Sequence, residues 1–212
     1  MQPDLIVATH SGITAEEYGV LSQIAPTLAQ SGEFDDFGMP WQEQTRVIGQ
    51  ALGRSGEAEA LIADVERQIE AAANPAFAGK TIAWITPAAA PGKFGVTGPN
   101  TPPMRFLATL GFAYPTEVAE SIGDQWSLRI SSERLDLIDV DVLIVRTPTQ
   151  ESLDAVKAAP LFQQLQVVKD GRVIFFVGDD PIYGALSFST VNSLPYVIEH
   201  LTPMLLDAVN KL

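Results

Sequence analysis

Residues 139–177, DVDVLIVRTPTQESLDAVKAAPLFQQLQVVKDGRVIFFV, decide the fold of this 212-residue chain. The stretch contains a short apolar run at 142–145, a longer segment of helical pattern at 152–165 and a second apolar run at 173–177. Short apolar runs between polar turns are typical of buried strands, and the segment between them is long enough for a helix. A strand, a helix and a strand in this order predict two parallel strands of an α/β fold.

The same alternation extends over the rest of the second half of the chain. Apolar runs predict strands, and apolar residues at helical spacing predict helices. The further elements expected are a strand over 81–85, a helix from Pro102 to Gly111, a short helix over 132–137 and a helix within 189–209. The connection between 85 and 100 is rich in proline, glycine and alanine and predicts a loop. Strands that alternate with helices in this way predict parallel pairing.

The first residues of the chain repeat the pattern on a smaller scale. Residues 5–8, Leu-Ile-Val-Ala, are apolar on both faces, which predicts a buried strand of a parallel sheet. A polar turn and helix-starting residues follow over 9–17. Residues 31–40 are rich in turn formers and predict a loop before an amphipathic helix over 41–52.

The clearest helix of the sequence covers residues 56–73. Ser55 is expected as its N-cap, and Asn74-Pro75 is expected to end it. Its apolar residues share one face: Ala58, Leu61, Ile62, Val65, Ile69 and Ala72. At 1.5 Å per residue the helix is about 27 Å long, which is enough to connect two lobes.

The composition excludes several classes of protein. The chain has 26 acidic and 13 basic residues, so its formal charge is -13 and it would repel a phosphate backbone. It contains no cysteine, which excludes disulfides, thiolate metal sites and thiol nucleophiles. No apolar run reaches the ~18 residues that a membrane-spanning helix requires.

The common catalytic and nucleotide-binding motifs GxGxxG, GxxxxGK[ST], HExxH and GxSxG do not occur in the sequence. His10 follows a strand end, where open α/β sheets place their ligands, and an ordinary loop histidine is the alternative. His200 lies on the last predicted helix, where we expect a solvated side chain. The acidic pairs Asp35-Asp36 and Asp179-Asp180 are typical of turns, and we assign them no metal.

Segments spread over the whole chain match the sequence patterns of one known family. They are PDLIV at 3–7 with IAPT at 24–27, SSERL at 131–135 with DVDVL at 139–143, VVKDGRV at 167–173, and SFS at 187–189 with NSLP at 192–195. Together they resemble the substrate-binding proteins of ferric-siderophore ABC importers, the class in which one long helix joins two α/β lobes.

The resemblance implies an α/β fold in three parts. Residues 1–55 are expected to form part of an N-terminal α/β lobe, 56–75 the connecting helix, and 76–212 a C-terminal lobe with a three-layer parallel sheet. The family's signal peptide, lipid-anchor cysteine and first strands have no counterpart in this sequence. We therefore expect that the N-terminal part of the family's chain is lacking here.

The resemblance also implies a function without chemistry, in which a ferric siderophore is captured between two lobes and delivered to a membrane permease. The chelate already saturates its iron, so we expect no resident cofactor, no metal ligands and no catalytic residues. The protein needs cationic groups, hydrogen-bond donors and aromatic surfaces instead. Family members carry a cleft arginine at the position that matches Arg105.

The residues expected to bind the ligand come from both lobes. Arg105 lies in the first turn of a helix, and Arg146 directly follows the strand over 142–145, so both guanidinium groups are candidates; a surface salt bridge is the alternative for each. Trp126 and Tyr183 are expected in loops, where they offer aromatic faces. In the first lobe the candidates are Thr9 and His10, in the loop after the first strand. Trp84 and Trp41 are expected to pack in the interior.

The partner expected from the resemblance is the ABC permease, which receives one glutamate from each lobe. Glu16 or Glu17 and Glu151 occupy plausible positions, and stabilisation of a helix start is the alternative role for each. The resemblance further implies a monomer that works in the periplasm or outside the cytoplasm, held at the membrane by a lipid anchor.

Other functions remain open from the sequence alone. The same fold can bind haem or cobalamin, because these ligands also need clefts lined by aromatic residues. An α/β enzyme that uses Arg105 and His10 as substrate-binding groups is a second alternative. A third alternative is a stable lobe that binds no ligand by itself.

Overall fold

The computed structural model describes residues 2–88, 92–123 and 125–212 of the chain. The chain divides into two compact units, Met1–Arg67 and Gln68–Leu212. The boundary falls within helix α3 (Ser55–Ala72), which is the helix predicted over 56–73. The three-part division with limits after residues 55 and 75 stays a prediction.

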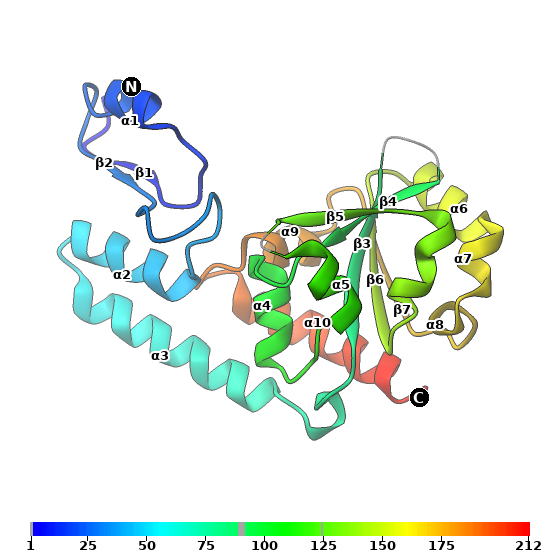
Figure 1. Ribbon diagram of the computed structural model, residues 1–212. Helices are drawn as coiled ribbons and strands as arrows, with labels where there is room; N and C mark the ends of the chain where they lie inside the picture. Colours follow the sequence, from blue (N-terminus) through cyan, green and yellow to red (C-terminus); the bar gives the residue numbers. More distant parts are fainter. Residues whose placement is uncertain (1, 89–91, 124) are drawn as a thin grey trace. The chain divides into compact units, whose positions relative to one another are not determined.

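The first unit is built on a small βαβ arrangement (Figure 1). Strands β1 (Ile6–Ala8) and β2 (Thr27–Ala29) pair in parallel, helix α1 (Ala15–Leu21) connects them, and α2 (Trp41–Ala51) and α3 follow. A capping box starts α1: the Thr14 hydroxyl accepts the Glu17 N–H at 3.2 Å, and the Glu17 carboxylate accepts the Thr14 N–H at 2.8 Å. The predicted strand and helix at the start of the chain are therefore confirmed.

The burial expected in the first unit is wrong at two positions. Val7 of β1 is 48% exposed, whereas Ile6 and Ala8, whose side chains point to the opposite face of the strand, are partly buried. Leu61 of α3 is also 48% exposed, whereas Ile62 and Val65 are buried. Adjacent residues of a helix are turned about 100° from each other, so Leu61 lies at the margin of the buried stripe that contains Ile62.

The predicted N-cap of α3 is also wrong. Ser55 is the first residue of the helix, and the carbonyl oxygen of Arg54 accepts the N–H groups of Glu57 and Ala58, both at 3.1 Å. The helix thus begins one position earlier than its cap pattern suggests, and the Arg54 guanidinium pairs with the Glu57 carboxylate in its first turn. A serine in the first turn is compatible with both placements, so the pattern alone does not separate them.

The second unit contains a mixed sheet of five strands in the order β5-β4-β3-β6-β7. The strands are β3 (Ile82–Pro87), β4 (Lys93–Thr97), β5 (Ser127–Ser131), β6 (Val142–Thr147) and β7 (Val173–Val177). β3, β6 and β7 are parallel, as predicted. β4 pairs antiparallel with both β3 and β5, so the expectation of a wholly parallel sheet is wrong. Gly95 and the glycine- and proline-rich surroundings of β4 hide its strand pattern.

Helices cover both faces of this sheet (Figure 1). They are η1 (Pro75–Phe77), α4 (Pro102–Thr109), α5 (Thr116–Ile122), η2 (Ser132–Ile138), α6 (Gln150–Ala158), α7 (Pro160–Gln164), α8 (Gln166–Lys169), α9 (Pro181–Phe188) and α10 (Leu194–Val209). On one face, Val118, Ile138, Val156, Phe162 and Val167 from α5 to α8 pack on Ala83, Ile85, Leu143 and Val145 of the strands. On the other face α10 contacts β6 and β7, and α9 contacts α10 and α4. The predicted three-layer α/β architecture is confirmed.

Pro160 divides the helix that the sequence predicts over 152–165. α6 ends at Ala158, Ala159 is extended with φ −67 and ψ 121, and Pro160 begins α7. Proline disfavours helical backbone at the residue before it and lacks the N–H that a helix interior needs. The prediction of one continuous helix is therefore wrong, and the residue that breaks it is visible in the sequence.

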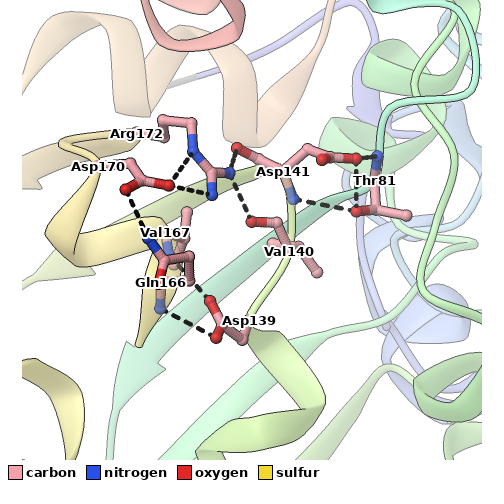
Figure 2. Close-up of polar contacts among 8 residues, drawn as sticks. All are labelled: Thr81, Asp139, Val140, Asp141, Gln166, Val167, Asp170 and Arg172. Carbon is pink, nitrogen blue, oxygen red and sulfur yellow. Dashed lines mark hydrogen bonds and ion pairs between the residues drawn. The ribbon is translucent and has the colours of Figure 1, made fainter. Parts of the chain in front are cut away.

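Figure 2 shows a hydrogen-bond network at the amino ends of β3, β6 and β7. Arg172, which precedes β7 and is 5% exposed, donates to the carbonyl oxygens of Val140 at 3.0 Å and of Asp141. Its Nη2 also donates to the Asp170 carboxylate at 3.0 Å. The Asp141 carboxylate in turn accepts the N–H of Thr81 at 2.8 Å and its hydroxyl at 3.0 Å.

Asp139 completes this network by capping α8. Its carboxylate accepts the N–H groups of Gln166 and Val167, each at 2.9 Å. Two of the segments that carry the family resemblance, 139–143 and 167–173, therefore meet in one structural network. The network lies at the amino ends of the parallel strands, so these two segments connect the starts of β3, β6 and β7.

Candidate ligand-binding site

Open α/β sheets bind their ligands at the carboxyl ends of their parallel strands. In the second unit these are the carboxyl ends of β3, β6 and β7, which are called the carboxyl edge below. Arg146 is the last residue but one of β6. Tyr183 lies in the first turn of α9, which follows β7 after a short turn. The sequence predicts a loop at Tyr183, which is wrong, because Asp180 and Pro181 start a helix before it.

Arg146 and Tyr183 are in direct contact. The guanidinium carbon Cζ of Arg146 lies 4.6 Å from the centroid of the Tyr183 ring, which is a cation–π geometry. The Tyr183 ring also contacts the Trp84 ring in a T-shaped arrangement, with 5.8 Å between their centroids. Trp84 is 3% exposed and lies 6.5 Å from Phe176, centroid to centroid. The interior position expected for Trp84 is confirmed, and its indole supports the ring that contacts the cation.

The Nε atom of Arg146 is buried and has no hydrogen-bond partner among the described residues. A buried donor that lacks an acceptor costs about 1–3 kcal/mol relative to one that is satisfied. The cost is removed when an acceptor oxygen arrives next to it. Arg146 is therefore a cation whose Nε lacks an acceptor within the described chain.

The position of Tyr183 follows from the start of α9. The Asp180 carboxylate accepts the N–H of Ile182 at 2.8 Å and the N–H of Tyr183 at 3.3 Å, and Pro181 occupies the first helical position. An acidic N-cap followed by proline is a strong helix start. The turn residue Asp180 therefore acts as the cap of α9.

Arg105 and Trp126 lie on two other elements of the second unit. Arg105 is on α4 and is half-buried, and this burial lowers the pKa of its guanidinium, which still leaves it protonated at neutral pH. Trp126 directly precedes β5 and is 47% exposed. Its carbonyl oxygen accepts the Gly98 N–H at 2.9 Å, and a Cβ at position 98 would lie 2.9 Å from that oxygen. Glycine is thus required beside Trp126, whose indole offers exposed aromatic surface.

Thr9 and His10 lie in the first unit, directly after β1. Thr9 is 3% exposed, so its side chain is buried. The His10 ring contacts the Phe37 ring in a T-shaped geometry, with 5.5 Å between centroids. The roles of Thr9 and His10 in ligand binding stay predictions, as do those of Arg105, Trp126, Arg146 and Tyr183.

The glutamates expected to contact a permease are all exposed at helix starts. Glu16 and Glu17 lie in the first turn of α1, and Glu151 lies in the first turn of α6. Hydrogen bonds from the Thr14 N–H and hydroxyl lower the pKa of the Glu17 carboxyl. Glu17 therefore has a structural role in α1, which leaves Glu16 as the more available carboxylate of this helix.

The second unit also contains a pocket that the sequence does not predict. Its volume is about 410 Å³, and its lining includes Pro87, Phe94, Ser132, Ser152, Val156 and Leu161. It lies on the face of the sheet that carries Phe94 of β4 and packs against Val156 of α6. Residues from β3, β4, η2, α6 and α7 line it, and no local sequence pattern joins elements that are so far apart in the chain.

Two further properties concern the described part of the chain as a whole. Residues 2–88, 92–123 and 125–212 contain no group of three or more histidine, aspartate or glutamate side chains placed to hold a metal ion. No helix within the same residues is long and apolar enough to cross a membrane.

Comparison with known proteins identifies the family. Residues 1–178 match the family model described as periplasmic binding protein. A periplasmic solute binding protein from Mycobacterium smegmatis is 31% identical and superimposes with a TM-score of 0.82, over 98% of this chain and 70% of that one. PiaA from Streptococcus pneumoniae, whose structure contains ferrichrome, is 27% identical with a TM-score of 0.82, over 99% of this chain and 71% of that one. No curated protein matches the chain.

A more distant structure extends the fold comparison. FhuD2 from Staphylococcus aureus, with bound ferrioxamine B, has a TM-score of 0.73 at 15% identity over 98% of this chain and 78% of that one, which shows the shared fold. The matching family consists of solute-binding proteins that work outside the cytoplasm. The solved structures that are 31% and 27% identical to this chain are also solute-binding proteins, and none of them is an enzyme. The enzyme alternative is therefore wrong, and the chain belongs to the periplasmic binding protein family as an extracytoplasmic solute-binding protein.

Proposed function

We propose that this protein captures a ferric siderophore and delivers it to the permease of an ABC importer. The observation that carries the proposal is the Arg146–Tyr183 contact at the carboxyl edge of the sheet, with a buried Nε that lacks an acceptor. A ferric siderophore presents oxygen atoms around its iron, and these are suitable acceptors for a guanidinium. The 27% identical iron-uptake protein from Streptococcus pneumoniae, which binds ferrichrome, supports an iron chelate as the ligand.

The proposed binding involves no chemical step. The iron enters as cargo inside a chelate whose donor atoms already surround it, so the protein contributes no metal ligand and needs no resident cofactor. Arg105 and Arg146 provide charge, and Trp126 provides exposed aromatic surface. The chain carries a formal charge of -13, so these arginines act at short range, within about one Debye length of ~8 Å.

The experiment that tests this proposal is a titration of tryptophan fluorescence with ferric siderophores, haem and cobalamin. Trp84 packs against Tyr183, so its indole reports on a ligand near Arg146, and Trp126 is exposed enough to report on a ligand that contacts it. We expect saturable quenching by at least one ferric siderophore and none by haem or cobalamin. Saturation by haem or cobalamin alone would transfer the proposal to that ligand. A titration without any saturation would contradict the proposal.

Delivery to the permease is the second part of the proposal. We assign Glu16 and Glu151 as the two exposed carboxylates that contact basic residues of the permease, because the Glu17 carboxylate already caps α1. E16A and E151A are expected to leave siderophore affinity unchanged and to reduce siderophore-stimulated ATPase activity of the permease in proteoliposomes. E120A, which removes an exposed glutamate of α5, is the matched control. Equal activity of all three variants would remove these residues from the proposal.

Lipid anchoring and the monomeric state remain predictions from the resemblance. Membrane fractionation of the native protein from its source cells tests the first, and size-exclusion chromatography with light scattering tests the second. A lipid-anchored protein remains with the membranes at high salt and is released by detergent.

A further inference from the structure

Arg146 differs from most arginines of this chain in its surroundings. Five arginines form ion pairs with carboxylates: Arg46, Arg54, Arg67, Arg134 and Arg172. No ion pair among the described residues includes Arg146, although the chain as a whole has an excess of acidic residues. Asp180, which lies on the adjacent turn, uses its carboxylate to cap α9. The positive charge of Arg146 is therefore not neutralised by a carboxylate of the described chain.

Tyr183 is engaged on two sides by residues of its own unit. One ring face receives the Arg146 guanidinium at 4.6 Å, and the ring contacts the buried Trp84 in a T-shaped arrangement at 5.8 Å. The ring face that the guanidinium covers cannot also stack on a ligand. The role of Tyr183 that these contacts favour is therefore to hold Arg146, and not to provide the flat surface that the sequence suggests.

The guanidinium is consequently pre-organised. β6 fixes the Arg146 backbone, Phe176 of β7 is its neighbour in register, and Tyr183 fixes the plane of the charged group. Pre-organisation reduces the entropy that a flexible cation loses on binding. A hydrogen bond from the Arg146 guanidinium is strongest when the acceptor is an ionised oxygen, because charge on both partners strengthens the bond.

We propose that Tyr183 is a positioning residue for Arg146, and that the pair selects ferric chelates with anionic oxygen atoms at their periphery over neutral or cationic ones. This inference rests on the proposed function, because it names the class of siderophore. Carboxylate and phenolate oxygens both carry the negative charge that the guanidinium is proposed to select. Ferric citrate, a carboxylate chelate, and ferric enterobactin, a catecholate chelate, distinguish between these two kinds of oxygen.

The first experiment compares affinities of the wild-type protein for ferric citrate, ferric enterobactin, ferrichrome and ferrioxamine B. We expect one of the two anionic chelates to bind at least about tenfold more tightly than the neutral ferrichrome or the cationic ferrioxamine B. Equal or tighter binding of ferrichrome would overturn the proposed selectivity while leaving a ferric siderophore as the ligand. Binding of none of the four would contradict the proposed function itself, and the selectivity with it.

The second experiment tests the positioning role with variants. R146Q and Y183L are each expected to lower the affinity for the preferred anionic chelate about tenfold or more. Y183F retains the ring, so its affinity is expected to stay within about threefold of wild type. The double variant R146Q/Y183L should bind no more weakly than R146Q alone, since Tyr183 acts through Arg146. R134Q removes an exposed arginine and Y196L an exposed ring, and both serve as controls without loss.

Two outcomes would overturn the positioning role. If Y183L weakens binding and R146Q does not, Tyr183 contacts the ligand itself. If the losses in the double variant multiply, the two residues act independently.

A third measurement needs no ligand. In ¹⁵N-labelled protein the Nε–H of Arg146 is expected to exchange slowly with water in the wild type and in Y183F, and at least about tenfold faster in Y183L. Equal exchange in Y183F and Y183L would show that the ring does not hold the guanidinium. This result would remove the positioning role whatever the protein binds.

Discussion

The Nη1 atom of Arg172 donates a hydrogen bond of 3.0 Å to the carbonyl oxygen of Val140, which lies 32 positions earlier in the sequence. The bond joins the residue before β7 to the segment before β6, at the amino ends of neighbouring parallel strands (Figure 2). Backbone hydrogen bonds hold β6 and β7 side by side along their length. The Arg172–Val140 bond connects the residues that precede the two strands. The family patterns at 139–143 and 167–173 thus have a structural cause.

Replacement of Arg172 by methionine is expected to lower the free energy of unfolding by about 2 kcal/mol, because the buried carbonyl oxygen of Val140 loses its donor. Urea unfolding followed by circular dichroism measures this change. R134M is the matched control, since the Arg134 side chain is 58% exposed and its ion pair contributes little. Ligand affinity should be unchanged, because Arg172 lies at the edge opposite the site. Equal stabilities of R172M and R134M would contradict the structural role.

The Arg172–Asp170 contact predicts a dependence of stability on acid. Hydrogen bonding from the Arg172 guanidinium lowers the pKa of the Asp170 carboxyl below its ordinary value of 3.8. A carboxyl whose pKa is lower in the folded state stabilises the fold above the unfolded pKa and loses this contribution as pH falls through the folded pKa. We therefore expect D170N to be less stable than wild type at pH 5–7, and the difference to shrink below about pH 4. A difference that grows as the pH falls would contradict this sign.

Gly49 lies where α2 and α3 approach each other closely in the first unit. A Cβ at this position would lie 2.4 Å from the Cβ of Ala58, so G49A forces the two helices apart. Overpacking of this kind costs about 1–3 kcal/mol. Gly19 of α1 is the control, because no atom lies within 4 Å of its added Cβ, and G19A is expected to be neutral or stabilising. Thermal unfolding compares the two variants, and a G49A protein as stable as G19A would refute the close contact.

Asp180 connects the stability of α9 to the ligand site. D180A removes the cap and is expected to cost about 1 kcal/mol of stability and to weaken siderophore binding, because Tyr183 loses its fixed position. D180N keeps an oxygen that can cap the helix and should retain both properties. Calorimetric titration with the preferred chelate separates the possibilities. If both variants bind an anionic chelate more tightly than wild type, the main effect of the Asp180 carboxylate on binding is to repel the chelate through its negative charge.

The elements of the fold that depend on local pattern were predictable from the sequence. The buried strands β3, β6 and β7 are continuous apolar runs, and α1 and α9 carry their start signals in Thr14, Glu17, Asp180 and Pro181. β4 and β5 escaped prediction, because Lys93–Thr97 and Ser127–Ser131 are short and have exposed positions. Their strand character comes mainly from pairing with residues distant in the chain.

The sequence by itself determined the α/β class, the long α3 helix and the family, since hydrophobic periodicity, caps and motif segments are properties of neighbouring residues. It also placed Arg146 at the carboxyl edge of a strand. Only the tertiary structure decided that the Arg146 guanidinium lies on the Tyr183 ring and that Trp84 supports this ring. These contacts join β3, β6 and α9, and their geometry depends on how the sheet and its covering helices pack, which no local pattern encodes.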